Sequence, residues 1–128
     1  MKKLKVGYDG LTAEEQARLD GIDFHVEAHR DYWYDRLSKM HGARTPSEEQ
    51  KERSYQVMTA WDHVMGTTAA GFRRERGLRR LVVLAGSGHV DRGIGIAARS
   101  GAKAATIHIA GAFDPGQDEA PADFVVTP

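Results

Sequence analysis

The densest apolar stretch of the chain runs from Leu81 to Ala85, where five apolar residues follow one another without a break. A run of this length that is rich in β-branched residues is typical of a buried strand. A glycine-broken loop over residues 86–95 follows, and then residues of helical composition. Strand, loop and helix in this order are characteristic of α/β proteins, in which sites lie at the carboxyl end of the strand. We therefore expect the functional site in the loop after Ala85.

Two helices are predicted before residue 42. Thr12 and Glu15 have the spacing of a capping box, so a short helix should begin there and end before Gly21. Residues 27–41 place their large apolar side chains on one helical face, and Gly42 follows where such a helix would end. The apolar face consists of Trp33, Leu37 and Met40.

A long helix is predicted to follow and to run to about residue 76. Thr45 is placed to cap it, Pro46 suits its first position, and Glu48 completes a second capping box. Large side chains then recur at alternating spacings of three and four residues, which indicates a continuous buried stripe. The members of this predicted stripe are Met58, Trp61, Met65, Thr68 and Phe72.

The remaining segments complete an α/β pattern. A short helix is expected over residues 94–100, and further strands are expected over residues 4–8, 104–109 and 123–127. We therefore predict an α/β fold with a small, mainly parallel sheet, flanking helices and a right-handed crossover.

In this prediction residues 1–128 form a single α/β unit. A helical lobe over residues 11–44 is inserted before the long helix, and residues 45–128 supply that helix and the β-loop-α-β core. So few strands leave one side of the sheet open, and another chain or segment would have to cover it.

The composition describes an ordinary globular protein and excludes several classes of function. The 128-residue chain has a formal net charge of zero and a pI of about 7.0, so no basic field would attract nucleic acid or acidic membranes. It contains no cysteine, which excludes disulfides, thiolate metal sites and thiol nucleophiles. No stretch approaches the ~20 apolar residues of a membrane span, and no signal peptide is recognisable at the start. The compartment stays open.

The loop after Ala85 offers His89 as its most reactive side chain. Gly86 and Gly88 should let the backbone turn sharply and leave room beside the imidazole. A dinucleotide site is disfavoured because Asp91 stands where the fingerprint needs its third glycine, and no Walker sequence follows. Ser87 lacks the sequence context of a nucleophile elbow.

Metal-assisted hydrolysis stays open from the residues alone. His89 and Asp91 could supply two ligands, and Asp62, His63 or His108 could approach them. The chain has no paired spacing such as His-Glu-x-x-His to strengthen that hypothesis.

Four motifs in register resemble the ChaN-like haem-binding proteins, which belong with the Tiki and erythromycin-esterase-like group. Leu81-Val-Val-Leu-Ala-Gly-Ser-Gly-His-Val, followed by Gly93-Ile-Gly95-Ile96, is similar to the family's "vvlaGxGHv…GiP" signature. Gln56-Val-Met-Thr-Ala-Trp61-Asp62-His-Val-Met65 resembles its "aQxxWDxxMA" helix. Gly10-Leu-Thr-Ala-Glu-Glu and Ala122-Asp123-Phe-Val-Val-Thr-Pro resemble its "GLxxLtpeE" and "aDyvxxtp" segments.

The chain departs from the family pattern at several points. Ala97 stands where the family has proline, and Gly66 stands where it has alanine. The family's N-terminal half, with its "GExH"-like motif, has no counterpart here, so the resemblance gives hydrolysis no support. Family members are usually exported lipoproteins. The resemblance identifies this chain with the family's C-terminal half.

The resemblance implies non-catalytic haem binding, in iron acquisition or haem handling, at a homodimer interface. The candidate iron ligands are His89 in the loop and, from the helical lobe, His41, Tyr34 or His29. His63, Gly86 and Gly88 are further candidates for contact with the cofactor. Two alternatives remain: a subunit or remnant of a metal-dependent hydrolase, with Asp62 and Asp91 near the metal, and a structural half-domain that needs a partner segment.

Overall fold

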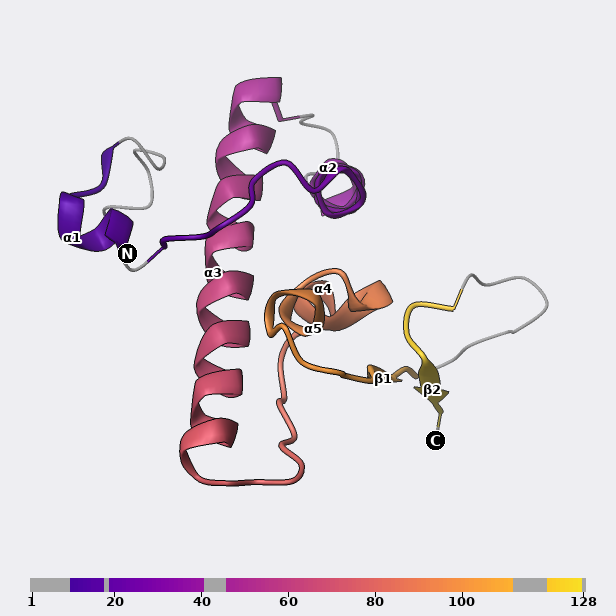
Figure 1. Ribbon diagram of the computed structural model, residues 1–128. Helices are drawn as coiled ribbons and strands as arrows, with labels where there is room; N and C mark the ends of the chain where they lie inside the picture. The colour runs from indigo at the N-terminus through magenta and orange to yellow at the C-terminus, as the bar shows by residue number, and fades with distance from the viewer. Residues whose placement is uncertain (1–9, 18, 41–45, 112–119, 128) are drawn as a thin grey trace. The chain divides into compact units, whose positions relative to one another are not determined.

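The computed structural model describes residues 10–17, 19–40, 46–111 and 120–127. It divides into two compact units, Met1–Trp61 and Asp62–Pro128. The first unit contains α1 (Ala13–Ala17), α2 (Glu27–Met40) and the first half of α3 (Glu48–Glu75), which are labelled in Figure 1. The predicted strand over residues 4–8 lies outside the described residues.

The second unit contains the rest of α3 and the elements that follow it. These are α4 (Ser87–Val90), the 3₁₀ turn η3 (Asp91–Gly93), α5 (Ile96–Arg99), β1 (Ile107–Ile109) and β2 (Phe124–Val126). The two strands are parallel, with Ile107 opposite Phe124 and Ile109 opposite Val126. Helices combined with a small parallel sheet confirm the predicted α/β class. Within the described ranges, no helix has the length and apolar character needed to cross a membrane.

Helices α1 and α3 begin at capping boxes, and the one at α3 differs from the sequence prediction. At α1 the capping box is as predicted: the Glu15 amide donates to the Thr12 hydroxyl (3.3 Å), and the Thr12 amide donates to the Glu15 carboxylate (2.9 Å). At α3 the cap is Ser47, whose hydroxyl accepts from the Gln50 amide (3.2 Å) while the Gln50 side chain accepts from the Ser47 amide (2.9 Å). Because α3 begins at Glu48, its cap is Ser47 rather than the predicted Thr45, which lies outside the described residues.

The buried stripe of α3 is also different from the predicted one. Trp61 and Phe72 are exposed, Thr68 is exposed, and Met58 and Met65 are half-buried. The buried residues of α3 are instead Tyr55, Thr59, Ala60, Asp62 and Gly66. Polar side chains can be buried on this face because residues distant in the sequence hydrogen-bond to them. The spacing of apolar residues cannot predict such partners.

After α3 the chain turns and runs back to α4 as an extended segment, visible in Figure 1. Gly77 makes the turn with φ +61, and the Leu78 amide donates to the Arg73 carbonyl (2.9 Å), which is a Schellman ending for the helix. Residues 81–85 of the extended segment carry no strand assignment, and Leu84 is 90% exposed. The predicted buried strand at Leu81–Ala85 is therefore wrong for the described structure. Its apolar pattern is that of a strand, but no residue in the described part of the chain pairs with it.

The sheet is held at its start by a carboxylate clamp. Asp123, just before β2, accepts hydrogen bonds from the Thr106 amide (2.7 Å) and the Thr106 hydroxyl (2.9 Å), just before β1. The same two bonds lower the pKa of Asp123, because they favour its ionised form. Contrary to the prediction of a buried strand over 104–109, Ile107 and Ile109 are exposed, and only Thr106 is buried.

Candidate functional site

His89 and Asp62 form the closest imidazole–carboxylate couple among the described residues. His89 Nδ1 lies 2.6 Å from Asp62 Oδ1. His89 belongs to α4 and Asp62 to the second half of α3, so the residues lie 27 positions apart in the sequence and within the same compact unit. Asp62 is completely buried, whereas the His89 side chain is 17% exposed. A rigid helix therefore holds the carboxylate, and the imidazole connects it to the surface.

Two glycines allow the backbone to close around this couple. A Cβ atom at Gly95 would collide with the His89 carbonyl oxygen and would lie 2.9 Å from Asp62 Oδ2. A Cβ atom at Gly66 would lie 2.8 Å from the Ile96 carbonyl oxygen and 2.9 Å from the Ser100 amide nitrogen. Gly95 thus lets the loop fold over the couple, and Gly66 lets α5 lie against α3.

The glycines singled out from the sequence have a smaller steric role. Gly86 has φ −61 and ψ 147, an extended conformation open to any residue, and a Cβ there would make only an ordinary contact, 3.9 Å from His89 Cδ2. The prediction that Gly86 is needed for a sharp turn is wrong on this geometry. Gly88 is buried inside α4. The close approach at Gly95 was missed, although Gly95 lies in the motif that carried the family resemblance.

A second imidazole–carboxylate couple lies in the same unit. His108 Nδ1, on β1, is 2.9 Å from Asp91 Oδ1, in η3. Asp91 is buried and the His108 side chain is 20% exposed. The segment from His89 to Asp91 therefore supplies the histidine of one couple and the carboxylate of the other. The sequence named all four residues as neighbours of a possible metal but did not predict this pairing.

The short bond between His89 and Asp62 has a consequence for coordination. If Asp62 is ionised, its carboxylate can only accept, and the proton of this bond then lies on Nδ1 of His89. In the neutral ring, Nε2 then carries the lone pair. If His89 binds a metal, it does so through Nε2, in the carboxylate–histidine–metal arrangement that orients metal-binding imidazoles in many proteins.

His63 follows Asp62 on α3 and is half-buried. Burial and then the positive charge of Arg99 lower the pKa of His63. Both effects favour the neutral imidazole, which is the form that binds metals.

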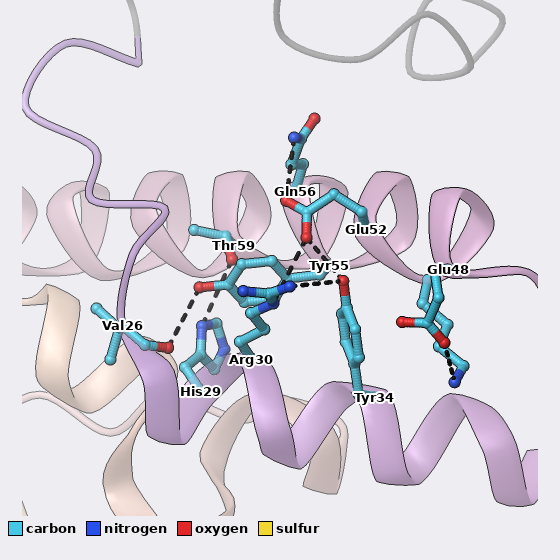
Figure 2. Close-up of polar contacts among 10 residues, drawn as sticks. Val26, His29, Arg30, Tyr34, Glu48, Glu52, Tyr55, Gln56 and Thr59 are labelled. Atoms are coloured by element: carbon cyan, nitrogen blue, oxygen red, sulfur yellow. Dashed lines mark hydrogen bonds and ion pairs between the residues drawn. The ribbon is translucent and has the colours of Figure 1, made fainter.

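Tyr34 lies in the first unit, in a polar network between α2 and α3 (Figure 2). Its hydroxyl donates to Glu52 Oε2 (2.7 Å), and Arg30 lies over its ring with 5.0 Å between the guanidinium carbon and the ring centroid. Burial, followed by the hydrogen bond to Glu52, raises the pKa of Tyr34. The phenol is therefore held in its protonated form, and a phenolate ligand would need this bond to be given up.

His29 is completely buried in the same unit, where it packs between α2 and α3. Its Nε2 accepts a hydrogen bond from Trp33 Nε1 (3.0 Å). Its Nδ1 lies 3.5 Å from Thr59 Oγ1, a contact that Figure 2 shows. The ring also makes an edge contact with Tyr55. These contacts describe a core residue, and its use as an iron ligand stays a prediction. His41 lies outside the described residues.

The described residues contain no group of three or more His, Asp or Glu side chains placed to hold a metal ion. Asp62 and Asp91 each face an imidazole instead. The structure thus brings His89 together with Asp62 and His108 together with Asp91, while His29 and Tyr34 lie in the other unit.

The fold and this couple define an α/β protein in which a histidine on α4 contacts a buried carboxylate on α3. The chain matches the family model described as haem-binding uptake, Tiki superfamily, ChaN, over residues 2–99. It belongs to this family, which confirms the resemblance found in the sequence. No curated protein and no solved structure matches the chain.

Proposed function

We propose that this protein binds haem, in uptake or handling rather than catalysis, with His89 as the iron ligand. The observation that carries the proposal is the 2.6 Å contact between His89 and the buried Asp62, in a chain that belongs to the haem-binding ChaN family. The imidazole would bind iron through Nε2. Bound haem would supply a coordinating iron centre within a planar, largely apolar ligand.

The donor chemistry of the chain fits this cofactor. With no cysteine, an iron ligand must be imidazole, phenolate or thioether. His89 is partly exposed and has a carboxylate on Nδ1, which orients the ring and increases its basicity toward a metal. Tyr34 is less suited because its hydroxyl is committed to Glu52. His29 is less suited because both ring nitrogens face polar neighbours in the core.

The proposal includes association into a homodimer. The exposed face of the two-stranded sheet carries four apolar side chains: Ile107, Ile109, Phe124 and Val126. The register places them in two cross-strand pairs on the same face. An apolar face of this kind is stabilised when it is covered, and a second copy of the chain could cover it. The mass in solution, with and without hemin, tests this part.

The test of haem binding is an optical titration of the purified protein with hemin. The wild type should give a saturable Soret band whose shape is that of imidazole ligation. The variant His89→Ala should lose that band shape. The matched variant His108→Ala removes the imidazole of the other couple and should keep it. A wild-type protein that leaves hemin unbound contradicts the proposal.

Hydrolysis is separable from this proposal by metal content. A metal-dependent hydrolase would retain stoichiometric zinc or manganese after purification and would lose its activity on chelation. The half-domain alternative predicts an aggregating or molten chain, without the near-UV circular dichroism of packed aromatic side chains. Neither alternative has a specific observation among the described residues in its favour.

A further inference from the structure

We infer that Asp62 is the positioning residue of the site: it fixes the Nδ1–H tautomer and the orientation of His89, so that Nε2 is the donor nitrogen. This inference rests on the proposed function for the identity of the ligand. It concerns two residues of the chain itself, and it can be tested on the protein without haem.

The first support is the geometry of the contact. The 2.6 Å distance between Nδ1 and Oδ1 is at the short end for hydrogen bonds, as charge-assisted bonds are. Asp62 is completely buried on a 28-residue helix, so its position is fixed by α3 and is shielded from competing water. A ring held in this way has one tautomer and one orientation.

The second support is the way the backbone is built around the carboxylate. A Cβ atom at Gly95 would lie only 2.9 Å from Asp62 Oδ2, so the backbone at Gly95 passes close to the carboxylate. A Cβ atom at Gly95 would also collide with the His89 carbonyl oxygen, so no residue with a side chain fits at this position. Glycine at this position thus lets the segment from His89 to Gly95 enclose the couple. Because the enclosure depends on backbone atoms, it leaves the carboxylate little freedom to move.

The consequence is a stronger nitrogen donor at Nε2. A carboxylate that accepts the Nδ1 proton increases electron density on the imidazole and favours the higher charge on a bound metal. Loss of such an outer partner typically weakens metal affinity by roughly 10- to 100-fold. We expect a loss of that size in hemin affinity when the negative charge of Asp62 is removed, together with a rise in the reduction potential of the complex.

The experiment compares Asp62→Asn with Asp91→Asn. Both substitutions keep the volume of the side chain and remove the charge of a carboxylate that faces a histidine Nδ1. Only the first acts on His89; the second acts on His108 and is the matched control. Nitrogen-15 chemical shifts of the histidine rings, recorded without haem at about pH 8 where an ordinary imidazole is neutral, report the tautomer. Hemin affinity and reduction potential are measured on the same variants.

The wild type should show His89 with its proton on Nδ1, and Asp62→Asn should shift the population toward Nε2–H or a mixture. Hemin affinity should fall about 10- to 100-fold in Asp62→Asn and stay within about twofold in Asp91→Asn. An Nε2–H ring in the wild type overturns the inference even if Asp62→Asn does not fold. So does a variant whose hemin affinity equals that of the control. If the wild type binds no hemin, the proposed function fails, and the tautomer alone decides whether Asp62 positions the ring.

Discussion

Gly66→Ala tests the contact between α3 and α5 that supports the site, and Gly71→Ala is its matched control. Both glycines lie on α3, in the second unit. Helix propensity alone predicts that either substitution stabilises the protein by up to about 1 kcal/mol, because alanine loses less conformational entropy than glycine. The structure predicts that only one of the two substitutions stabilises the protein, since the space around the two positions is different.

At Gly71 an added Cβ meets nothing within 4 Å, so the propensity gain should be realised. At Gly66 the Cβ would lie 2.8 Å from the Ile96 carbonyl oxygen, 2.9 Å from the Ser100 amide nitrogen and 3.0 Å from the Arg99 carbonyl carbon. All three are backbone atoms, so α5 must move as a whole. Overpacking of this kind costs about 1–3 kcal/mol, and after the propensity gain the net loss is roughly 0–2 kcal/mol.

The assay is thermal and denaturant unfolding followed by circular dichroism. For a chain of this size, 1 kcal/mol corresponds to roughly 4 °C in the midpoint. Gly71→Ala should raise the midpoint, and Gly66→Ala should leave it unchanged or lower it, with the two variants separated by roughly 1–3 kcal/mol. If Gly66→Ala stabilises as much as Gly71→Ala, α5 does not lie against α3 as described.

Three further predictions concern the hydrogen bonds between Asp123 and Thr106, the hydroxyl of Tyr34 and the exposed face of the sheet at Ile109. The clamp bonds lower the pKa of Asp123, so they stabilise the fold above the ordinary carboxyl pKa, and this stabilisation is lost as the pH falls through the lowered value. In Asp123→Asn the midpoint of denaturant unfolding should therefore fall less steeply as the pH is lowered through that range. An unchanged pH dependence would show that Asp123 does not stabilise the fold in this way. Tyr34→Phe should lower the free energy of unfolding by less than about 1 kcal/mol, because the hydrogen bond to Glu52 is only partly buried. The spectrum with hemin should stay unchanged; a changed spectrum would identify Tyr34 as the iron ligand. Ile109→Lys should weaken self-association, read as mass in solution by light scattering, and an unaltered mass excludes this face as the interface.

Local signals predicted most of the helices. The capping box at Thr12 and Glu15 and the periodicity of residues 27–41 depend on neighbours within a few positions, and α1 and α2 follow them. The same signals were ambiguous at the start of α3, where Thr45 and Ser47 both have capping spacing. The order of strand, loop and helix after Leu81 predicted the α/β class, and the two short strands are parallel as expected.

Long-range partners explain what the sequence did not predict. Asp62 is buried because His89 contacts it from 27 positions away, and apolar periodicity assigns a charged residue to the surface. The predicted stripe through Trp61 follows the three- and four-residue spacing of large side chains, and Trp61 is exposed. Leu81–Ala85 has the composition of a strand, but strand formation also needs a hydrogen-bonding neighbour, which composition does not reveal.

Chemical rescue of His89→Gly tests whether His89 holds the iron. Removal of the imidazole leaves space beside Asp62, and free imidazole in the buffer can enter it, bond to the carboxylate and present its other nitrogen to iron. If His89 is the iron ligand, His89→Gly with hemin lacks the wild-type absorption spectrum and regains it as imidazole is added. Asp62→Asn in the same background should weaken the rescue. A His89→Gly variant that keeps the wild-type spectrum without imidazole shows that the iron ligand lies elsewhere.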